Sequence, residues 1–98
     1  MSQTLRNVGS DTRIGHAFIY AGCGYGGSCF PKDMKALIHM AEGSGGDAGV
    51  LRAVESRNRR QKARLLEKIS ARFDGKLDGR TVAVWGLAFK PGTDDLRE

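Results

Sequence analysis

Apolar residues recur at helical spacing in two stretches of the chain. The first stretch shows the i, i+3, i+4, i+7 pattern of an amphipathic helix at Met34, Leu37, Ile38 and Ala41. Pro31 suits the first position of this helix, because its φ is already helical and its missing N–H is not needed there. Gly43 is typical of a helix end, and the glycine-rich residues 43–49 predict a flexible joint.

The second stretch predicts a longer helix, from about Asp47, a good N-cap residue, to about Phe73. At the helical rise it would be about 40 Å long, too long for a compact chain of this size to surround. Its apolar stripe is dense near both ends and is interrupted in the middle by Asn58 and Gln61. We therefore interpret it as a connector or a dimer seam, with Asn58 and Gln61 near the crossing of two copies.

The two ends of the chain give weaker patterns. Residues 1–20 predict the end of a helix and then an extended piece. Residues 81–85 are apolar on both faces, as in a parallel strand inside an α/β sheet. Asp95 followed three residues later by Glu98 is typical of a capping box, which predicts the start of another helix. A strand followed by a helix start is half of a βα unit, so we expect an internal fragment of a larger protein.

Composition narrows the protein class. The 98 residues make at most one small domain, and 40% hydrophobic with 28% charged residues is ordinary for a soluble globular chain. No apolar run approaches a membrane span and no signal peptide opens the chain, so we expect a cytoplasmic protein with free thiols and no membrane partner. Cys23 and Cys29 match no common zinc spacing, and we expect no metal site.

The net charge of +5 raises the question of nucleic acid binding. Between Arg52 and Arg72 there are eight basic and two acidic residues. This segment holds no aromatic residue that could stack on bases, and it matches no nucleic-acid-binding motif. We therefore favour a helix face that meets solvent or an acidic partner, and a nucleic-acid binder is the less favoured alternative.

The glycine-rich loop before the first helix has two interpretations. Gly22, Gly24 and Gly27 fit the G-x-G-x-x-G spacing of a dinucleotide-binding loop. That fingerprint needs a helix that opens on the third glycine, whereas four more residues intervene here and a basic helix follows instead of a strand. The pattern therefore does not favour a Rossmann loop, although consecutive glycines still allow a close approach to a phosphate or a sugar.

Cys29 is the candidate nucleophile. It lies just before a helix N-terminus, where unpaired N–H groups favour an anion, and Lys32 adds positive charge one turn away. Both features favour the reactive thiolate, and Asp33 in the same turn could take part in proton transfer. An inert buried cysteine is the alternative interpretation. For Cys23, which no helix follows, the inert interpretation is favoured.

Three motifs carry a resemblance to a known family. They are RIG at residues 13–15, GGSCFPKD at residues 26–33 and GLAFKPGTDDLRE at residues 86–98. Together they resemble the UDP-glucose 6-dehydrogenase family, part of the nucleotide-sugar dehydrogenases that include GDP-mannose dehydrogenase, over about residues 9–98. The resemblance implies a mainly α fold: the helical middle region of such an enzyme, with a long central dimerisation helix and the first strand of a truncated C-terminal Rossmann-like domain.

The resemblance also implies a division into segments. Residues 1–46 would be the end of the catalytic domain with its cysteine loop, residues 47–74 the connecting helix, and residues 75–98 the start of the UDP-binding domain. The family oxidises the C6 alcohol of UDP-glucose to a carboxylate with two NAD, through a thiohemiacetal and a thioester on a cysteine. A homodimer or a higher homo-oligomer is implied as well.

Site residues follow from the same resemblance. Cys29 corresponds to the nucleophile and Asp33 to the acidic residue that assists it. The residues implied to contact NAD are Cys29, Lys32 and Arg97. Arg13 corresponds to an arginine that reaches the substrate of the neighbouring subunit. The other residues implied to contact the nucleotide sugar are Tyr20, Gly22, Gly24, Tyr25, Gly26, Phe89 and Lys90.

Several family features have no counterpart in this sequence. The N-terminal NAD domain is absent, as are the lysine and asparagine that stabilise the alkoxide and the glutamate of acid–base catalysis. We therefore expect the chain to be inactive alone, and the alternative function is a non-catalytic oligomerising helical module derived from the enzyme. Cys23 replaces an expected proline, valine or isoleucine, and Phe30 favours the UDP-glucose branch over the GDP-mannose branch.

Overall fold

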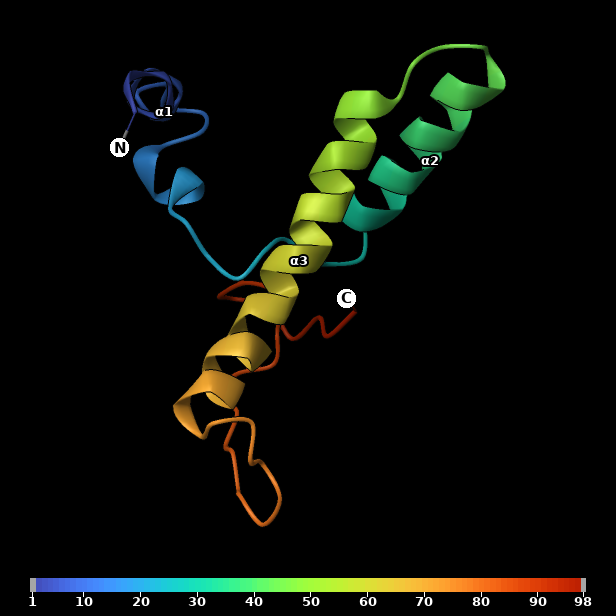
Figure 1. Cartoon of the computed structure of the whole chain (residues 1–98). Helices are drawn as coiled ribbons and strands as arrows, with labels where there is room; N and C mark the ends of the chain where they lie inside the picture. The colour runs from blue at the N-terminus through green and yellow to red at the C-terminus, as the bar shows by residue number, and fades with distance from the viewer. Residues whose placement is uncertain (1, 98) are drawn as a thin grey trace.

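The computed structural model describes residues 2–97, which form a mainly α-helical, elongated molecule. The helices are α1 (Gln3–Gly9), the short 3-10 helix η1 (His16–Ile19), α2 (Phe30–Gly43) and α3 (Gly49–Arg72). The molecule measures 50 × 35 × 29 Å. Helix α3 runs along its length, α2 folds back beside one end of α3, and α1 with η1 forms a separate arm (Figure 1). The expectation of a mainly α fold is confirmed.

Helix α2 begins and ends close to its predicted bounds. Cys29 is the N-cap residue and Pro31 is the second helical residue, one position later than predicted, where a missing N–H is equally harmless. The helix ends at Gly43 as predicted, and the Ser44 hydroxyl donates to the Met40 carbonyl at 3.0 Å. Of the predicted apolar face, Ile38 is buried, while Leu37 stays half exposed.

A tight turn joins α2 to α3. The Gly46 amide donates to the Ala41 carbonyl at 2.8 Å, and Ala48 is buried beneath the turn. Arg52 of α3 forms a two-pronged ion pair with Glu42 of α2. Helix α3 begins two residues after Asp47, whose carboxylate accepts a hydrogen bond from the Gly49 amide at 2.8 Å. The residues of the predicted joint form a hydrogen-bonded turn that sets the two helices side by side.

The C-terminal predictions of a strand and a helix are wrong for the described residues. Residues 81–85 form no strand, and the Trp85 side chain is fully exposed. A parallel strand exists only through hydrogen bonds to a neighbouring strand, and residues 2–97 provide none here. No helix begins at Asp95, whose carboxylate accepts from the Arg97 backbone N–H at 3.0 Å; Glu98 lies outside the described residues.

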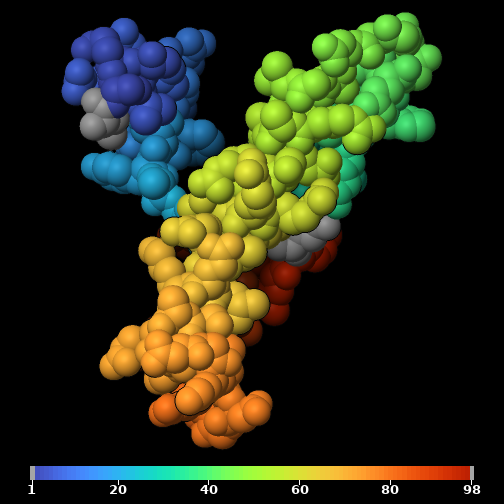
Figure 2. Space-filling view, in the orientation of Figure 1, coloured from blue at the N-terminus to red at the C-terminus, as the bar shows by residue number. Residues whose placement is uncertain are grey.

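The described residues bury little apolar surface. Ile38 and Ala48 are the buried hydrophobic side chains, whereas much of the α3 stripe is exposed at Val50, Val54, Leu65 and Leu66. Figure 2 shows that α1 and η1 stand apart from the body formed by α2 and α3. None of the helices in residues 2–97 is both long and apolar enough to cross a membrane.

Candidate functional site

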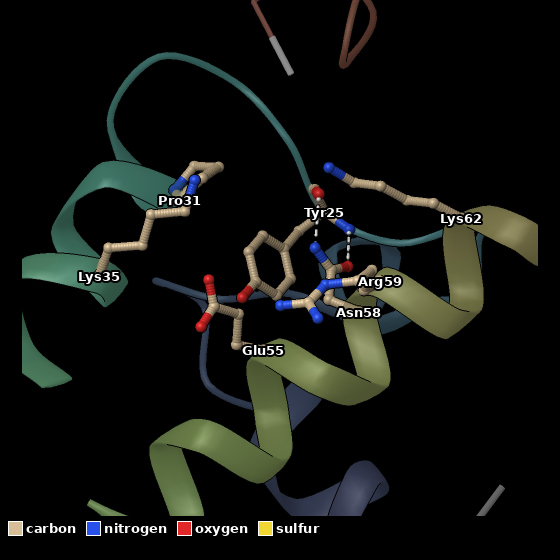
Figure 3. A pocket seen from close by; sticks show the side chains of 7 residues that line it. All are labelled: Tyr25, Pro31, Lys35, Glu55, Asn58, Arg59 and Lys62. Atoms are coloured by element: carbon tan, nitrogen blue, oxygen red, sulfur yellow. Dashed lines mark hydrogen bonds between the residues drawn. The ribbon is translucent and has the colours of Figure 1, made fainter.

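The glycine-rich loop is fastened to the middle of α3 by side-chain amides. The Asn58 Oδ1 atom accepts from the Tyr25 backbone N–H at 2.7 Å, and the Asn58 Nδ2 atom donates to the Tyr25 carbonyl at 3.0 Å (Figure 3). One turn further along α3, Gln61 Nε2 donates to the Gly22 carbonyl at 2.7 Å. Sequence analysis placed Asn58 and Gln61 at a dimer crossing and missed this role within the chain.

Glycine is required where the loop touches α3. At Gly24 φ is +110°, and a Cβ atom there would lie 2.7 Å from Asn58 Oδ1. Any larger residue would therefore strain the backbone and push the Asn58 amide away. The G-x-G-x-x-G spacing thus serves contact with a helix of this chain at Gly24.

The loop then leads into the cysteine through two aromatic contacts. The Tyr25 ring meets the Phe30 ring edge to face, with centroids 4.7 Å apart. Gly27 is buried under the Phe89 ring: its φ is +99°, and a Cβ atom would lie 2.8 Å from a ring carbon. Tyr25 and Phe89 therefore fix the backbone on both sides of Ser28.

The segment of residues 86–97 docks on this loop. The Gly27 amide donates to the Arg97 carbonyl at 3.1 Å, and the Phe89 amide donates to the Asp95 carbonyl at 3.2 Å. Hydrogen bonds from Arg97, with a smaller one from Ser28, lower the pKa of Asp95 to about 2. The two motifs at opposite ends of the resemblance therefore meet at one place.

Cys29 stands exposed at this junction. As the N-cap residue of α2 it accepts a hydrogen bond at its carbonyl from the Asp33 amide, at 2.8 Å. Its Sγ atom lies 3.7 Å from Ser28 Oγ. The pKa of Arg97 is raised chiefly by its ion pair with Asp95, and the nearby Cys29 contributes the smallest share. Cys29 is thus open to a reactant; Cys23 is exposed too, so burial does not distinguish the two thiols.

A basic pocket adjoins the cysteine. Its volume is about 290 Å³, and it is lined by Gly27, Ser28, Lys32, Lys35 and Arg97. Two of the five guanidinium N–H donors of Arg97 engage Asp95, at 3.0 and 3.2 Å, and orient the side chain. Three cations beside the N-terminus of α2 form a setting that suits a phosphate or pyrophosphate group. These residues fit the anionic part of a dinucleotide.

The remaining predicted site residues lie apart from this junction or only border it. Arg13 sits on the N-terminal arm, where its guanidinium pairs with Asp11 at 2.8 Å and is largely exposed. Tyr20 is also exposed, at the end of that arm. The Lys90 ammonium lies 5.3 Å from the centroid of the neighbouring Phe89 ring. Gly22 and Gly26 belong to the loop itself. Within residues 2–97 no cluster of His, Cys, Asp or Glu could hold a metal ion.

Comparisons with known proteins identify the family. Residues 1–60 match the sequence model of the UDP-glucose/GDP-mannose dehydrogenase family, central domain. The chain is 68% identical over 93 residues to UDP-glucose 6-dehydrogenase of Pseudomonas aeruginosa, which covers 95% of the chain and 20% of that relative. It is 50% identical over 97 residues to UDP-glucose 6-dehydrogenase AglM of Haloferax volcanii, with 99% and 22% covered.

A third relative, UDP-glucose 6-dehydrogenase TuaD of Bacillus subtilis, is 43% identical over 97 residues, with 99% of the chain and 21% of the relative covered. The chain therefore spans about a fifth of the length of these relatives. The family match covers more than half of the chain and includes the cysteine loop and α2. This chain belongs to the UDP-glucose/GDP-mannose dehydrogenase family.

Proposed function

We propose that this chain supplies the cysteine loop, the connecting helix and part of the nucleotide-sugar site of an NAD-dependent UDP-glucose 6-dehydrogenase. The observation that carries the proposal is the docking of residues 86–97 on the loop before Cys29. This contact, made through Gly27, Phe89 and Arg97, places an exposed thiol beside a basic pocket. A four-electron oxidation of an alcohol to an acid needs such a nucleophile to retain the intermediate aldehyde.

Cys29 acts in the middle of the reaction. Its thiolate adds to the C6 aldehyde carbon, the carbonyl π electrons move to oxygen, and a proton completes a thiohemiacetal. After the second oxidation the sugar is held as a thioester. Water then adds to the thioester carbon, the C–S bond breaks, and the carboxylate leaves as the thiolate is restored. NAD, when bound, supplies the hydride acceptor for both oxidations.

The other predicted residues take supporting roles. Asp33, one helical turn after Cys29, accepts a proton from the attacking water at the thioester stage. Lys32 and Arg97 hold anionic oxygens of NAD in the basic pocket. The remaining predicted residues contact the nucleotide sugar: Tyr20, Gly22, Gly24, Tyr25, Gly26, Phe89 and Lys90. Arg13, carried on the outlying arm, reaches the substrate of a neighbouring subunit.

Assembly completes the proposal. The exposed apolar residues of α3, among them Val50, Leu65 and Leu66, would be covered by a second copy. The chain alone would not turn over UDP-glucose, because the first oxidation requires groups that residues 2–97 do not present. The exposed stripe also favours the alternative of a non-catalytic oligomerising module.

A segment exchange distinguishes the catalytic function from the alternative of a non-catalytic oligomerising module. The matching 93-residue segment of the Pseudomonas aeruginosa enzyme is replaced by that of this chain, and NADH formation from UDP-glucose and NAD is followed by absorbance. We expect sustained NADH formation in the exchanged enzyme and no sustained formation after Cys29→Ser, because Cys29 acts only after the first oxidation. A folded exchanged enzyme that makes no NADH, or one whose Cys29→Ser variant remains fully active, would refute the proposal. Self-association without activity would support the oligomerising module.

A further inference from the structure

The Asn58 side chain binds the loop in the manner of a neighbouring strand. Both its acceptor and its donor engage the backbone of the same residue, Tyr25, at 2.7 and 3.0 Å. Asn58 is partly buried at this contact, so water competes poorly for either hydrogen bond. Asparagine is a mediocre helix former, and nothing about α3 itself favours it at this position. Its fit to the backbone N–H and C=O of one loop residue explains its presence at this position.

A second observation supports the same contact independently. Gly24 brings its backbone so close to Asn58 that no side chain fits between them. Gln61, on the same face one turn later, holds Gly22. Three residues of the loop, Gly22, Gly24 and Tyr25, thus contact one helix, α3. A rigid helix is a more precise support for a site than another loop.

The Tyr25 backbone, held by Asn58, is linked to Cys29 by side-chain packing. The Tyr25 ring packs against the ring of Phe30, the residue that follows Cys29 and begins α2. A change in the Tyr25 backbone would therefore displace the start of α2. We propose that Asn58, assisted by Gln61, is a positioning residue: it sets the backbone of the glycine loop and thereby the place of Cys29. Its value to catalysis rests on the proposed function, but its effect on the loop and on the thiol does not.

The test uses the full chain and needs no substrate. Hydrogen exchange of the Tyr25 amide and the rate of Cys29 alkylation by iodoacetamide are measured in Asn58→Ala, Gln61→Ala and Ser56→Ala. Ser56 lies exposed on the same helix and serves as the matched control. Asn58→Ala should speed exchange at Tyr25 by about tenfold or more, as expected when its two hydrogen bonds are lost. It should also change the Cys29 rate relative to Cys23, while Ser56→Ala changes neither.

A double substitution distinguishes positioning from a general loss of structure. Gly24→Ala displaces the Asn58 amide, so its effect on Tyr25 exchange should shrink in the Asn58→Ala background. Helicity of α3 should be retained in all variants. Unchanged Tyr25 exchange in folded Asn58→Ala, or fully additive effects, would overturn the inference. Failure of the exchanged enzyme to make NADH would instead count against the proposed function and leave the loop measurements as they are.

Discussion

Replacing Gly27 by alanine should undock residues 86–97 from the cysteine loop. Gly27 has φ +99°, a region that costs a residue with a Cβ about 1–3 kcal/mol. The new methyl group would also lie 2.8 Å from the Phe89 ring, inside van der Waals contact. The ring cannot remain, because its carbon atoms and the Cβ would overlap. Phe89 must move, and the Gly27–Arg97 backbone hydrogen bond goes with it.

The undocking is measured at the residue 27 amide, with the titration of Asp95 as a second probe. Hydrogen bonds from Arg97 and Ser28 hold the pKa of Asp95 at about 2, against an ordinary value of 3.8. Carboxyl ¹³C titration by NMR should show only a small rise in the pKa of Asp95 in Gly27→Ala, because the Ser28 contribution is lost while the hydrogen bonds from Arg97, two residues away, remain. Exchange of the residue 27 amide should speed up in parallel.

Two alanine substitutions serve as controls. Gly22→Ala, in the same loop, meets no atom within 4 Å and has no left-handed φ, so it should leave Asp95 unchanged. Gly86 has φ +89° and no atom lies within 4 Å of a Cβ built there. Gly86→Ala therefore shows the effect of backbone strain alone, without a steric clash. A residue 27 amide that exchanges as slowly in Gly27→Ala as in the unaltered chain would refute the reasoning, as would an equal acceleration of that exchange in Gly22→Ala.

Three further predictions concern pH, reactivity and stability. Because hydrogen bonds from Arg97 depress the pKa of Asp95, the stability that this carboxylate gives to the Asp95–Arg97 turn is complete above about pH 4. It is lost as the pH falls towards 2, and the amide shift of Arg97 should follow that titration. Cys29 should be alkylated faster than Cys23, since only Cys29 precedes a helix N-terminus; equal labelling in peptide mapping would remove the electrostatic argument. Ile38→Ala should lower the free energy of unfolding by about 2–4 kcal/mol and Leu37→Ala by much less, because Ile38 is 6% and Leu37 50% exposed; equal shifts in denaturant midpoint would contradict this packing.

The helices could be predicted from the sequence because their signals are local. Apolar spacing, Pro31 and Gly43 placed the bounds of α2 within a residue, and Asp47 placed the start of α3 within two. A strand was predicted at residues 81–85 but does not form in the described residues, since a strand depends on a neighbour that local composition does not reveal. Within residues 1–20 a helix end and an extended piece were predicted, whereas the structure has α1 (Gln3–Gly9) and the 3-10 helix η1 (His16–Ile19).

In the candidate site too, features with a local sequence signal could be predicted, and contacts between distant residues could not. The place of Cys29 at a helix N-terminus follows from Pro31, whereas the contact between its loop and residues 86–97 was not predicted from the sequence. Asn58 was assigned to a dimer crossing, because a polar residue in an apolar stripe can face its own chain or a second copy. The spacing of Asn58 and Gln61 on one helix face was the available signal.

The cysteine loop and the motif at residues 86–97 meet within a single chain. A nuclear Overhauser measurement on the labelled chain tests this contact directly, because Gly27 lies in contact with the Phe89 ring. Strong cross-peaks between the Gly27 α protons and the Phe89 ring protons are expected, and they should persist on dilution. In Gly27→Ala the new methyl protons should give no cross-peak to that ring, because the ring has moved away. Absence of these cross-peaks in the folded chain, with residues 86–97 giving random-coil shifts, would contradict the account.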